Sequence, residues 1–290
     1  MQAVTAQLLE KHVFAKPWFD RQGLIVACDS ARPVGFAHAG FGAADAHGLL
    51  DTTQGTTCLL LVSPHDDRQV IATELLAASE NYLRQRGATQ IYAGSQFPLN
   101  PFYLGLYGSS DLAGVLNSNS GLVSLLKALD YRPTRRRVLS GVGLASFRPP
   151  VDRQQMNVRR RFKLAGPLDV LPGNWWEACV WSLHEWSRFD LVLPGGGEPI
   201  VSATFWDVEP LARTWGVQTV GLVCLEDTAE AREQGLSTFL LAEALRYYQA
   251  NGYAQFEAQA KAEDTSLRQL FDQLGLKEYD EGALWMKNPA

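Results

Sequence analysis

The residues best suited to chemistry stand in a short turn in the second half of the chain. Residues 231–241 read "AREQGLSTFLL", between the strand-like run "TVGLVCLE" (219–226) and the helical run "AEALRYYQANGY" (242–253). The first N–H groups of a helix have no partner within the helix, and the helix dipole adds partial positive charge at that end. A helix start of this kind binds anions, and phosphates in particular.

Three residue types in this turn favour a phosphate ligand. Gly235 has no Cβ, so a pyrophosphate can approach the backbone closely, while Ser237 offers a hydroxyl and Arg232 a positive charge. A Walker A loop needs a lysine after the glycine, and a dinucleotide-binding fingerprint needs three glycines where this turn has one. The spacing therefore predicts a phosphate-binding turn of another kind.

The first half of the chain holds a counterpart of this turn without the glycine. Residues 66–76 read "DDRQVIATELL", in which Asp67, Val70 and Ala72 take the places of the three residues just named. The branched side chain of Val70 would block the backbone, and Asp66 and Asp67 would repel a phosphate. We therefore expect only the second turn to bind the anion.

Both turns belong to a longer internal repeat. At an offset of 165, the helix-like run at 69–86 corresponds to 234–251, and "TQIYAG" (89–94) corresponds to "AQFEAQ" (254–259). The offset then falls to 145, because the first copy carries about 20 extra residues, which we place in a loop at 97–119. A functional loop and a packing insertion both fit this composition.

The repeat predicts two tandem copies of one fold. We expect an N-terminal domain, a polar linker and a C-terminal domain at residues 1–148, 149–157 and 158–290. Residues 134–147 are predicted to form a closing pair of strands, and 174–189 a tryptophan-rich helix. The last helix is expected to start at Asp264 or Thr265 and to stop before Gly275.

The overall composition bounds the class of protein. The chain has 290 residues, is 46% hydrophobic and carries a net charge of -5, which argues against a dedicated nucleic-acid binder. Its four cysteines form no C-x-x-C pair, so we expect no metal site. No apolar run has the roughly 18 residues of a membrane span, and the N-terminus lacks the order of a signal peptide. We expect a cytoplasmic protein with no membrane partner.

The spacing Arg232-x-x-Gly235-x-Ser237, between a strand and an amphipathic helix, resembles motif A of the GCN5-related N-acetyltransferases. That family, called GNAT, has the pattern Q/R-x-x-G-x-G/A, so Ser237 departs mildly from it. The order of strands and helices is also similar, over roughly residues 200–290 and again over 20–147. The resemblance implies an α/β fold (α+β by some schemes) with two tandem GNAT-like domains. Each would have a mixed, mostly antiparallel central sheet flanked by helices.

The resemblance also implies an activity: transfer of an acetyl or other acyl group from acyl-coenzyme A directly to an amine, in the C-terminal domain. Acetyl-CoA would be the co-substrate. Amides of the turn would hold its pyrophosphate, and a backbone N–H of the preceding strand would polarise the thioester carbonyl. The coenzyme A-binding residues implied are Leu225, Arg232, Glu233, Gln234, Gly235, Leu236, Ser237 and Thr238.

Three residues are candidates for proton transfer. Glu226 ends the strand before the turn, where GNAT members often carry a carboxylate that serves as the base. Glu257, in the next strand, is a second candidate for the base, and Tyr279 is a candidate for the acid. Many GNAT members place a tyrosine in the last helix, where this chain has Phe271.

The absence of that tyrosine keeps a second class of function open, a non-catalytic coenzyme A-binding sensor or scaffold module. The acceptor would be a small-molecule or peptide amine, and a homodimer stays open. The four tryptophans at 175–186 fit an aromatic acceptor pocket, although we expect a core helix face at the domain interface. The arginine runs at 135–137 and 159–161 are interpreted as charged edge strands.

Overall fold

The computed structural model describes residues 5–45, 47–99, 102–104, 110–181, 184–208 and 216–288. The elements of the N-terminal half are α1 (Ala6–Leu9), the π-helix η1 (Glu10–Phe14), the 3₁₀ helix η2 (Arg21–Gly23), β1 (Leu24–Asp29), β2 (Arg32–Ala43), β3 (Leu50–Val62), α2 (Arg68–Gln85), β4 (Gln90–Ala93), β5 (Val115–Leu116), α3 (Ser120–Ala128) and β6 (Tyr131–Gly143).

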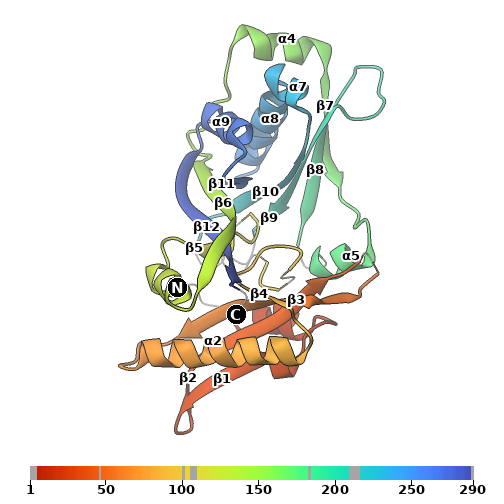
Figure 1. Cartoon of the computed structure of the whole chain (residues 1–290). Coiled ribbons are helices and arrows are strands. Elements are labelled where there is room, and N and C mark those ends of the chain that lie inside the picture. Colours follow the sequence, from red (N-terminus) through yellow and green to blue (C-terminus); the bar gives the residue numbers. More distant parts are fainter. Residues whose placement is uncertain are drawn as a thin grey trace.

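The elements of the C-terminal half are α4 (Arg153–Arg161), β7 (Lys163–Asp169), α5 (Trp175–Trp181), β8 (Trp186–Val192), β9 (Val201–Asp207), β10 (Thr219–Glu226), α7 (Ala229–Glu233), α8 (Leu236–Ala250), β11 (Gln255–Lys261), α9 (Thr265–Gln273) and β12 (Lys277–Lys287). Figure 1 shows the two halves one above the other, with the warm colours of the N-terminal half below.

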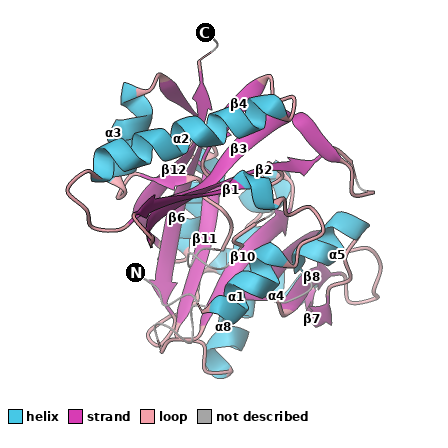
Figure 2. Ribbon diagram, turned by 90° about the horizontal axis from the view of Figure 1, so that it is seen from below, coloured by secondary structure: helices cyan, strands magenta, loops and turns pink. Residues whose placement is uncertain are grey.

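The described strands form one sheet that runs through both halves. Its order is β1-β2-β3-β4-β12-β6-β11-β10-β9-β8-β7, with β5 paired to β12. Neighbours are antiparallel except for two parallel pairs, β3 with β4 and β10 with β11. Helices flank the sheet in both halves, as the view from below in Figure 2 also shows. The predicted fold class, a mixed and mostly antiparallel sheet flanked by helices, is confirmed.

The last strand of each half completes the sheet of the other half. β12 pairs with β4 through Trp285 and Met286, although it comes from the C-terminal half. β6 pairs with β11 from Gly143 opposite Gln255 to Arg137 opposite Lys261, although it comes from the N-terminal half (Figure 1). This exchange makes the seam between the halves a set of backbone ladders.

The internal repeat agrees with the structure. α2 ends at Gln85 and α8 at Ala250, which differ by the predicted offset of 165. α3 (Ser120–Ala128) and α9 (Thr265–Gln273) differ by 145, so the insertion lies between β4 and α3. The expected N-cap is also confirmed, because the Asp264 side chain accepts the N–H of Leu267 at 2.9 Å.

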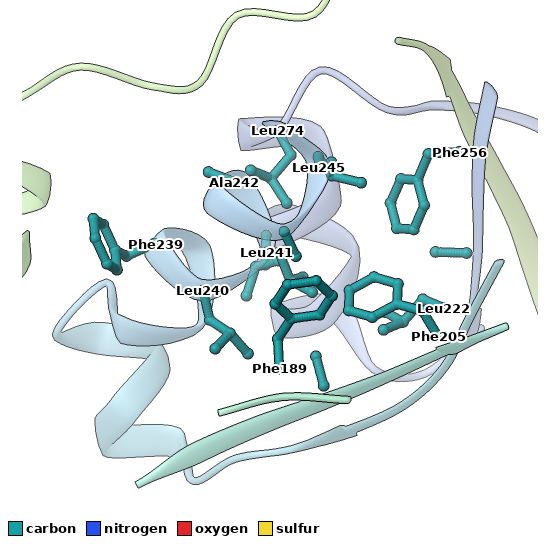
Figure 3. Close-up of a cluster of buried hydrophobic side chains, with 14 of the residues drawn as sticks. Phe189, Phe205, Leu222, Phe239, Leu240, Leu241, Ala242, Leu245, Phe256 and Leu274 are labelled. Atoms are coloured by element: carbon teal, nitrogen blue, oxygen red, sulfur yellow. The ribbon is translucent and has the colours of Figure 1, made fainter. Parts of the chain in front are cut away.

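The apolar core of the C-terminal half fixes the start of α8. Phe189, Phe205 and Phe256 point from the strands toward Leu241 and Leu245 of α8, and all five are buried (Figure 3). Burial of each such side chain stabilises the fold by about 1.5–3 kcal/mol. The helix is therefore held firmly against the sheet, and its first turn has a defined position above β10 and β11.

Two expectations about local structure were wrong. Residues 174–189 do not form one helix: α5 stops at Trp181, and β8 begins at Trp186 because it pairs with both β7 and β9. Residues 134–147 do not form a pair of strands. They contribute the single strand β6, whose neighbours come from the C-terminal half.

The arginine runs do not lie on edge strands. Residues 135–137 belong to β6, which is an interior strand, and 159–161 form the last turn of α4. α4 begins inside the segment predicted as a linker at 149–157. The division into two domains stays a prediction, because the sheet continues through both.

Candidate functional site

β10 and β11 separate to open a split in the sheet. They pair in parallel only where Thr219–Gly221 face Gln255–Glu257. Beyond that point β10 continues to Glu226 beside β9, and β11 continues to Lys261 beside β6. Strand edges that face each other without pairing leave backbone donors and acceptors for a ligand to bind.

Gly235 shapes the turn at the mouth of the split. Its φ of 72° lies in the left-handed region that favours glycine. A Cβ at this position would come within 2.9 Å of the Gln154 side chain and 3.0 Å of the Gln155 side chain. Backbone geometry and the approach of α4 therefore both require the glycine, in addition to any access it gives a ligand.

The first amides of α8 are the donors of the turn. The first bond within the helix runs from the N–H of Phe239 to the carbonyl of Gly235, at 3.0 Å. The N–H groups of Leu236, Ser237 and Thr238 precede that bond, at the positively polarised end of a 15-residue helix. This arrangement suits a phosphate group, as the sequence predicts.

Asp227 gathers the polar side chains of the turn. Its carboxylate is 2% exposed and accepts two hydrogen bonds from the Arg232 guanidinium, at 2.7 and 2.9 Å, and one from the Ser237 hydroxyl, at 2.6 Å. The hydrogen bond with Asp227 raises the pKa of Arg232. The sequence suggests a free cation and a free hydroxyl for the ligand, whereas both groups here hold the turn in shape.

Arg232 also links the two sides of the split. Asp227 follows β10 and Asp264 follows β11, and the Nη1 of Arg232 donates to Oδ1 of Asp264 at 3.2 Å. The Asp264 side chain is 32% exposed, so this second ion pair contributes at most about 1 kcal/mol. A ligand that enters the split from the turn can therefore break the ion pair between Arg232 and Asp264 at a small cost in free energy.

α4 crosses the start of α8 and covers one side of the turn (Figure 1). Nε2 of Gln154 donates to the carbonyl of Glu233 at 2.8 Å, and Nε2 of Gln155 donates to that of Gly235 at 3.3 Å. A polar hollow of about 510 Å³ lies between α4, the turn and α9. A second hollow of about 320 Å³ brings Arg161 to the same turn.

The remaining residues expected to bind coenzyme A lie around these hollows. Thr238 is 5% exposed and lines the larger hollow together with Glu233. Gln234 is exposed and lines the smaller one with Leu236. Leu225 is half-buried and packs against the core beneath α8. The structure thus gathers the predicted set at one end of the split.

Glu257 and Tyr279 meet at the base of the split. Glu257 is 6% exposed at the last paired position of β11, and its Oε1 accepts the N–H of Ser110 at 2.9 Å. Tyr279 lies at a β-bulge of β12, a device that redirects a side chain. Partial desolvation, the charge of Glu257 and a hydrogen bond to it raise the pKa of Tyr279, although the residue as a whole is 58% exposed.

Glu226 lies at the other end of the split. It is five residues beyond the last paired position of β10, which is about 16 Å along a strand. Its side chain is 59% exposed, and its Oε2 is 3.7 Å from Nη2 of Arg188. Glu226 lines a cavity of about 510 Å³ with Val223 and Cys224. The three predicted catalytic residues therefore occupy two separate places.

Part of the inserted loop lies over the split. The Ser110 carbonyl accepts Nε1–H of Trp206 at 2.8 Å, and the Asp111 carbonyl accepts Nε2–H of Gln259 at 2.7 Å. Desolvation raises the pKa of the Asp111 carboxyl, which lines the same cavity as Glu226. Residues 100–101 and 105–109 of the predicted insertion lie outside the described residues.

The N-terminal half has its own split, between β3 and β4. These strands pair only where Gln54–Thr57 face Gln90–Ala93, and an apolar cavity of about 350 Å³ lies between them, α2 and α3. α2 starts directly at Arg68, and Val70 is 57% exposed within it. The described lining of this cavity does not reach that helix start.

Sequence reasoning missed several residues of the site. Asp227 follows the predicted strand directly, and an acidic residue there was a usable signal for its pairing with Arg232. Gln154 and Gln155 carried no signal, because the segment was expected to be a linker. Phe271 is 1% exposed in the core.

Among the described residues, no group of three or more His, Cys, Asp or Glu side chains is placed to hold a metal ion. No helix in the described part of the chain is long and apolar enough to cross a membrane.

Solved structures resemble this chain, whereas no protein-family model and no curated protein sequence matches it. A tandem GNAT protein from the clavulanic acid biosynthesis pathway is 15% identical, with a TM-score of 0.60 over 91% of this chain and 82% of its own. A GCN5-related N-acetyltransferase from Sphaerobacter thermophilus is 15% identical, with a TM-score of 0.60 over 92% and 80%. A glucosamine N-acetyltransferase region of a fungal multi-domain β-N-acetylglucosaminidase is 17% identical, with a TM-score of 0.64 over 96% of this chain and 36% of its own.

Proposed function

We propose that this chain, which has the fold of the tandem GCN5-related N-acetyltransferases, transfers an acetyl or other acyl group from acyl-coenzyme A to an amine in its C-terminal half. The observation that carries the proposal is the position of the split between β10 and β11 directly below the start of α8. Coenzyme A needs both features next to each other. The helix start binds the negatively charged phosphates, and the split admits the narrow arm that carries the thioester.

The pyrophosphate of coenzyme A would bind the N–H groups of Leu236, Ser237 and Thr238. Gly235 gives the turn its shape, and Arg232 holds it through Asp227. Arg161 of α4 supplies a nearby positive charge from the adjoining hollow. The pantetheine arm would follow the free edge of β10, where a backbone N–H near Leu225 would polarise the thioester carbonyl.

The acceptor amine would approach from the cavity that Glu226 lines, on the face of the sheet away from α8. Glu226 is the base in this proposal, since it ends β10 beside the split and is open to the cavity. A carboxylate that accepts a proton from the attacking amine contributes about 100-fold or more to the rate. Glu257 and Tyr279 form a hydrogen-bonded pair opposite Gly221, about 13 Å along the strand from Leu225, so the departing sulfur would take its proton from the solvent or the amine rather than from this pair.

A thiol-release assay with acetyl-CoA and a panel of amines tests the proposal. We expect coenzyme A release that depends on the acceptor, and a kcat about 100-fold lower in Glu226→Gln with unchanged affinity for acetyl-CoA. Glu230→Gln is the matched control, because Glu230 is an exposed acid on α7 outside the cavity. Equal loss of activity in both variants would remove Glu226 from the role of base.

One observation favours the second function, a coenzyme A-binding sensor. Phe271 is buried in the core at the position where many GNAT members carry a tyrosine acid. The same assay separates the two: tight binding of acetyl-CoA without acceptor-dependent release of coenzyme A would support the sensor. Turnover with any amine of the panel would support the enzyme.

A further inference from the structure

The cavity beside Glu226 has walls that select among amines. It measures about 510 Å³ and lies on the face of β8, β9 and β10 away from α8, with α5 beside it. Its chemically distinctive lining residues are Asp111, Glu177, Trp181, Trp186, Arg188 and Glu226. The acceptor would approach from this cavity, so any preference among amines rests on the proposed function and deepens it.

One wall of the cavity is a column of stacked indole rings. The rings of Trp181 and Trp186 stack with their centroids 4.4 Å apart, and Trp186 lies 5.9 Å from Trp206 at an interplanar angle of 21°. Nε1 of Trp186 donates to the carbonyl of Trp181 at 3.2 Å, and Trp206 is fully buried. The rings are therefore held in place before a ligand arrives. Because Trp186 is stacked between Trp181 and Trp206, the wall offers the Trp181 ring and the edge of Trp186 to a flat apolar group.

The charges of the cavity are predominantly negative. Its described lining has three carboxylates, Asp111, Glu177 and Glu226, and one guanidinium, Arg188. Desolvation raises the pKa of Asp111, which favours its neutral form, and the charge of Arg137 opposes this shift. The Arg188 guanidinium donates to Asp190 at 2.6 Å and to the hydroxyl of Ser202 at 2.8 Å, and it lies 3.7 Å from Oε2 of Glu226, so it offsets part of the charge of Glu226.

Of the three carboxylates, Glu177 is the one whose negative charge is least offset by neighbouring cations. Its Oε2 accepts the N–H of Gly173 at 2.8 Å, and in the described part of the chain no lysine or arginine forms an ion pair with it. A cationic ligand would relieve this excess of negative charge, whereas a carboxylate or phosphate on the ligand would add to it.

We propose that the acceptor is a primary amine that enters as its ammonium form, carries an aromatic or other flat apolar body, and bears no carboxylate or phosphate beside the nitrogen. The body packs against Trp181 and Trp186, and the ammonium lies among the carboxylates. One proton passes from the ammonium to Glu226, and the freed lone pair attacks the thioester carbon. The N–C bond forms and the C–S bond breaks. The thiolate of coenzyme A then takes up a proton, which is either the second proton that leaves the nitrogen or one from the solvent.

Calorimetric titration of the full chain, without acetyl-CoA, tests this with three matched ligands. Phenethylamine carries the ammonium and the ring, phenylalanine adds a carboxylate, and 3-phenylpropionate has the carboxylate without the ammonium. We expect phenethylamine to bind at least tenfold more tightly than phenylalanine, and 3-phenylpropionate not to bind. Equal or tighter binding of phenylalanine, or no binding of phenethylamine, would overturn the inference.

Substitution of Glu177 locates the binding. Glu177→Gln should weaken phenethylamine binding at least threefold, because it removes a charge from the cavity without changing the size of the side chain. Glu198→Gln, in an exposed loop outside the cavity, is the control and should leave the affinity unchanged. Equal affinities in Glu177→Gln and the unsubstituted protein would place the amine elsewhere.

A failure of this inference can be distinguished from a failure of the proposed function. If the chain binds acetyl-CoA and acetylates phenylalanine but not phenethylamine, the acceptor class is wrong and the transferase proposal stands. If phenethylamine binds as expected and acetyl-CoA does not bind, the transferase proposal fails and the cationic amine site stands.

Discussion

At the scale of single residues, the turn before α8 depends on a carboxylate that the motif does not contain. Arg232, Gly235 and Ser237 could be identified from their spacing, and the structure brings them together. Their orientation could not be predicted, because it is set by the buried Asp227, which accepts hydrogen bonds from both Arg232 and Ser237. Spacing identifies the residues of a turn, whereas burial decides which atoms remain available to a ligand.

The first prediction concerns this carboxylate. Asp227→Asn leaves the Arg232 guanidinium and the Ser237 hydroxyl without a charged acceptor at a site that is 2% exposed. We expect the free energy of unfolding to fall by about 1–3 kcal/mol, measured by denaturant titration. Asp264→Asn is the control: it keeps a side-chain N-cap for α9 and removes only the half-exposed pair, so its effect should stay below about 1 kcal/mol. Similar effects of the two substitutions would contradict this role of Asp227.

At the scale of elements, the repeat predicted the helices well and the strand partners poorly. α2 and α8, and α3 and α9, match at the two offsets seen in the sequence. The exchange of β6 and β12 was not predictable, because a strand pattern shows which face is buried and not which neighbour it pairs with. β8 was expected to be helical because the tryptophans before and within it follow a helical spacing.

The exchange yields a prediction about the separate halves. Residues 149–290 alone lack β6, so β11 and β12 would both lose an antiparallel neighbour and expose an interior edge. We expect this fragment to aggregate or stay unfolded, and mixing it with residues 1–148 to restore one cooperative unfolding transition by circular dichroism. A monomeric fragment that unfolds cooperatively without its partner would contradict the exchanged arrangement.

At the scale of the whole molecule, the N-terminal segment joins the two halves on the side of α5. The rings of His12 and His184 lie 5.1 Å apart, and the Lys16 ammonium donates to the carbonyl of Cys179. His38 is fully buried on β2, with its Nδ1 2.8 Å from the Tyr103 hydroxyl. These contacts bury neutral imidazoles in the folded protein.

Acid should therefore destabilise the molecule before its carboxylates titrate. Burial lowers the pKa of His12 and His38 from 6.5 to about 4, and that of His184 to about 3. Below pH 6.5 the unfolded chain binds more protons than the folded one, so stability is complete above pH 6.5 and falls toward pH 4. We expect the Tm to fall steadily between pH 6.5 and 5, with a smaller slope in His38→Gln. A constant Tm over this range would contradict the prediction.

The two halves should differ in one respect above all: the C-terminal half, and not its counterpart, binds coenzyme A. Gln234 and Gln69 are exposed and occupy equivalent places in the two turns, at the offset of 165. Replacing either with glutamate adds one negative charge at constant size, so only the turn that holds the pyrophosphate should respond.

Calorimetric titration of acetyl-CoA into these two variants decides between the halves. We expect an affinity about five- to tenfold weaker in Gln234→Glu, with a loss that shrinks as salt is added, and an unchanged affinity in Gln69→Glu. The opposite pattern, with the loss in Gln69→Glu alone, would assign coenzyme A to the split between β3 and β4 and contradict the proposed site.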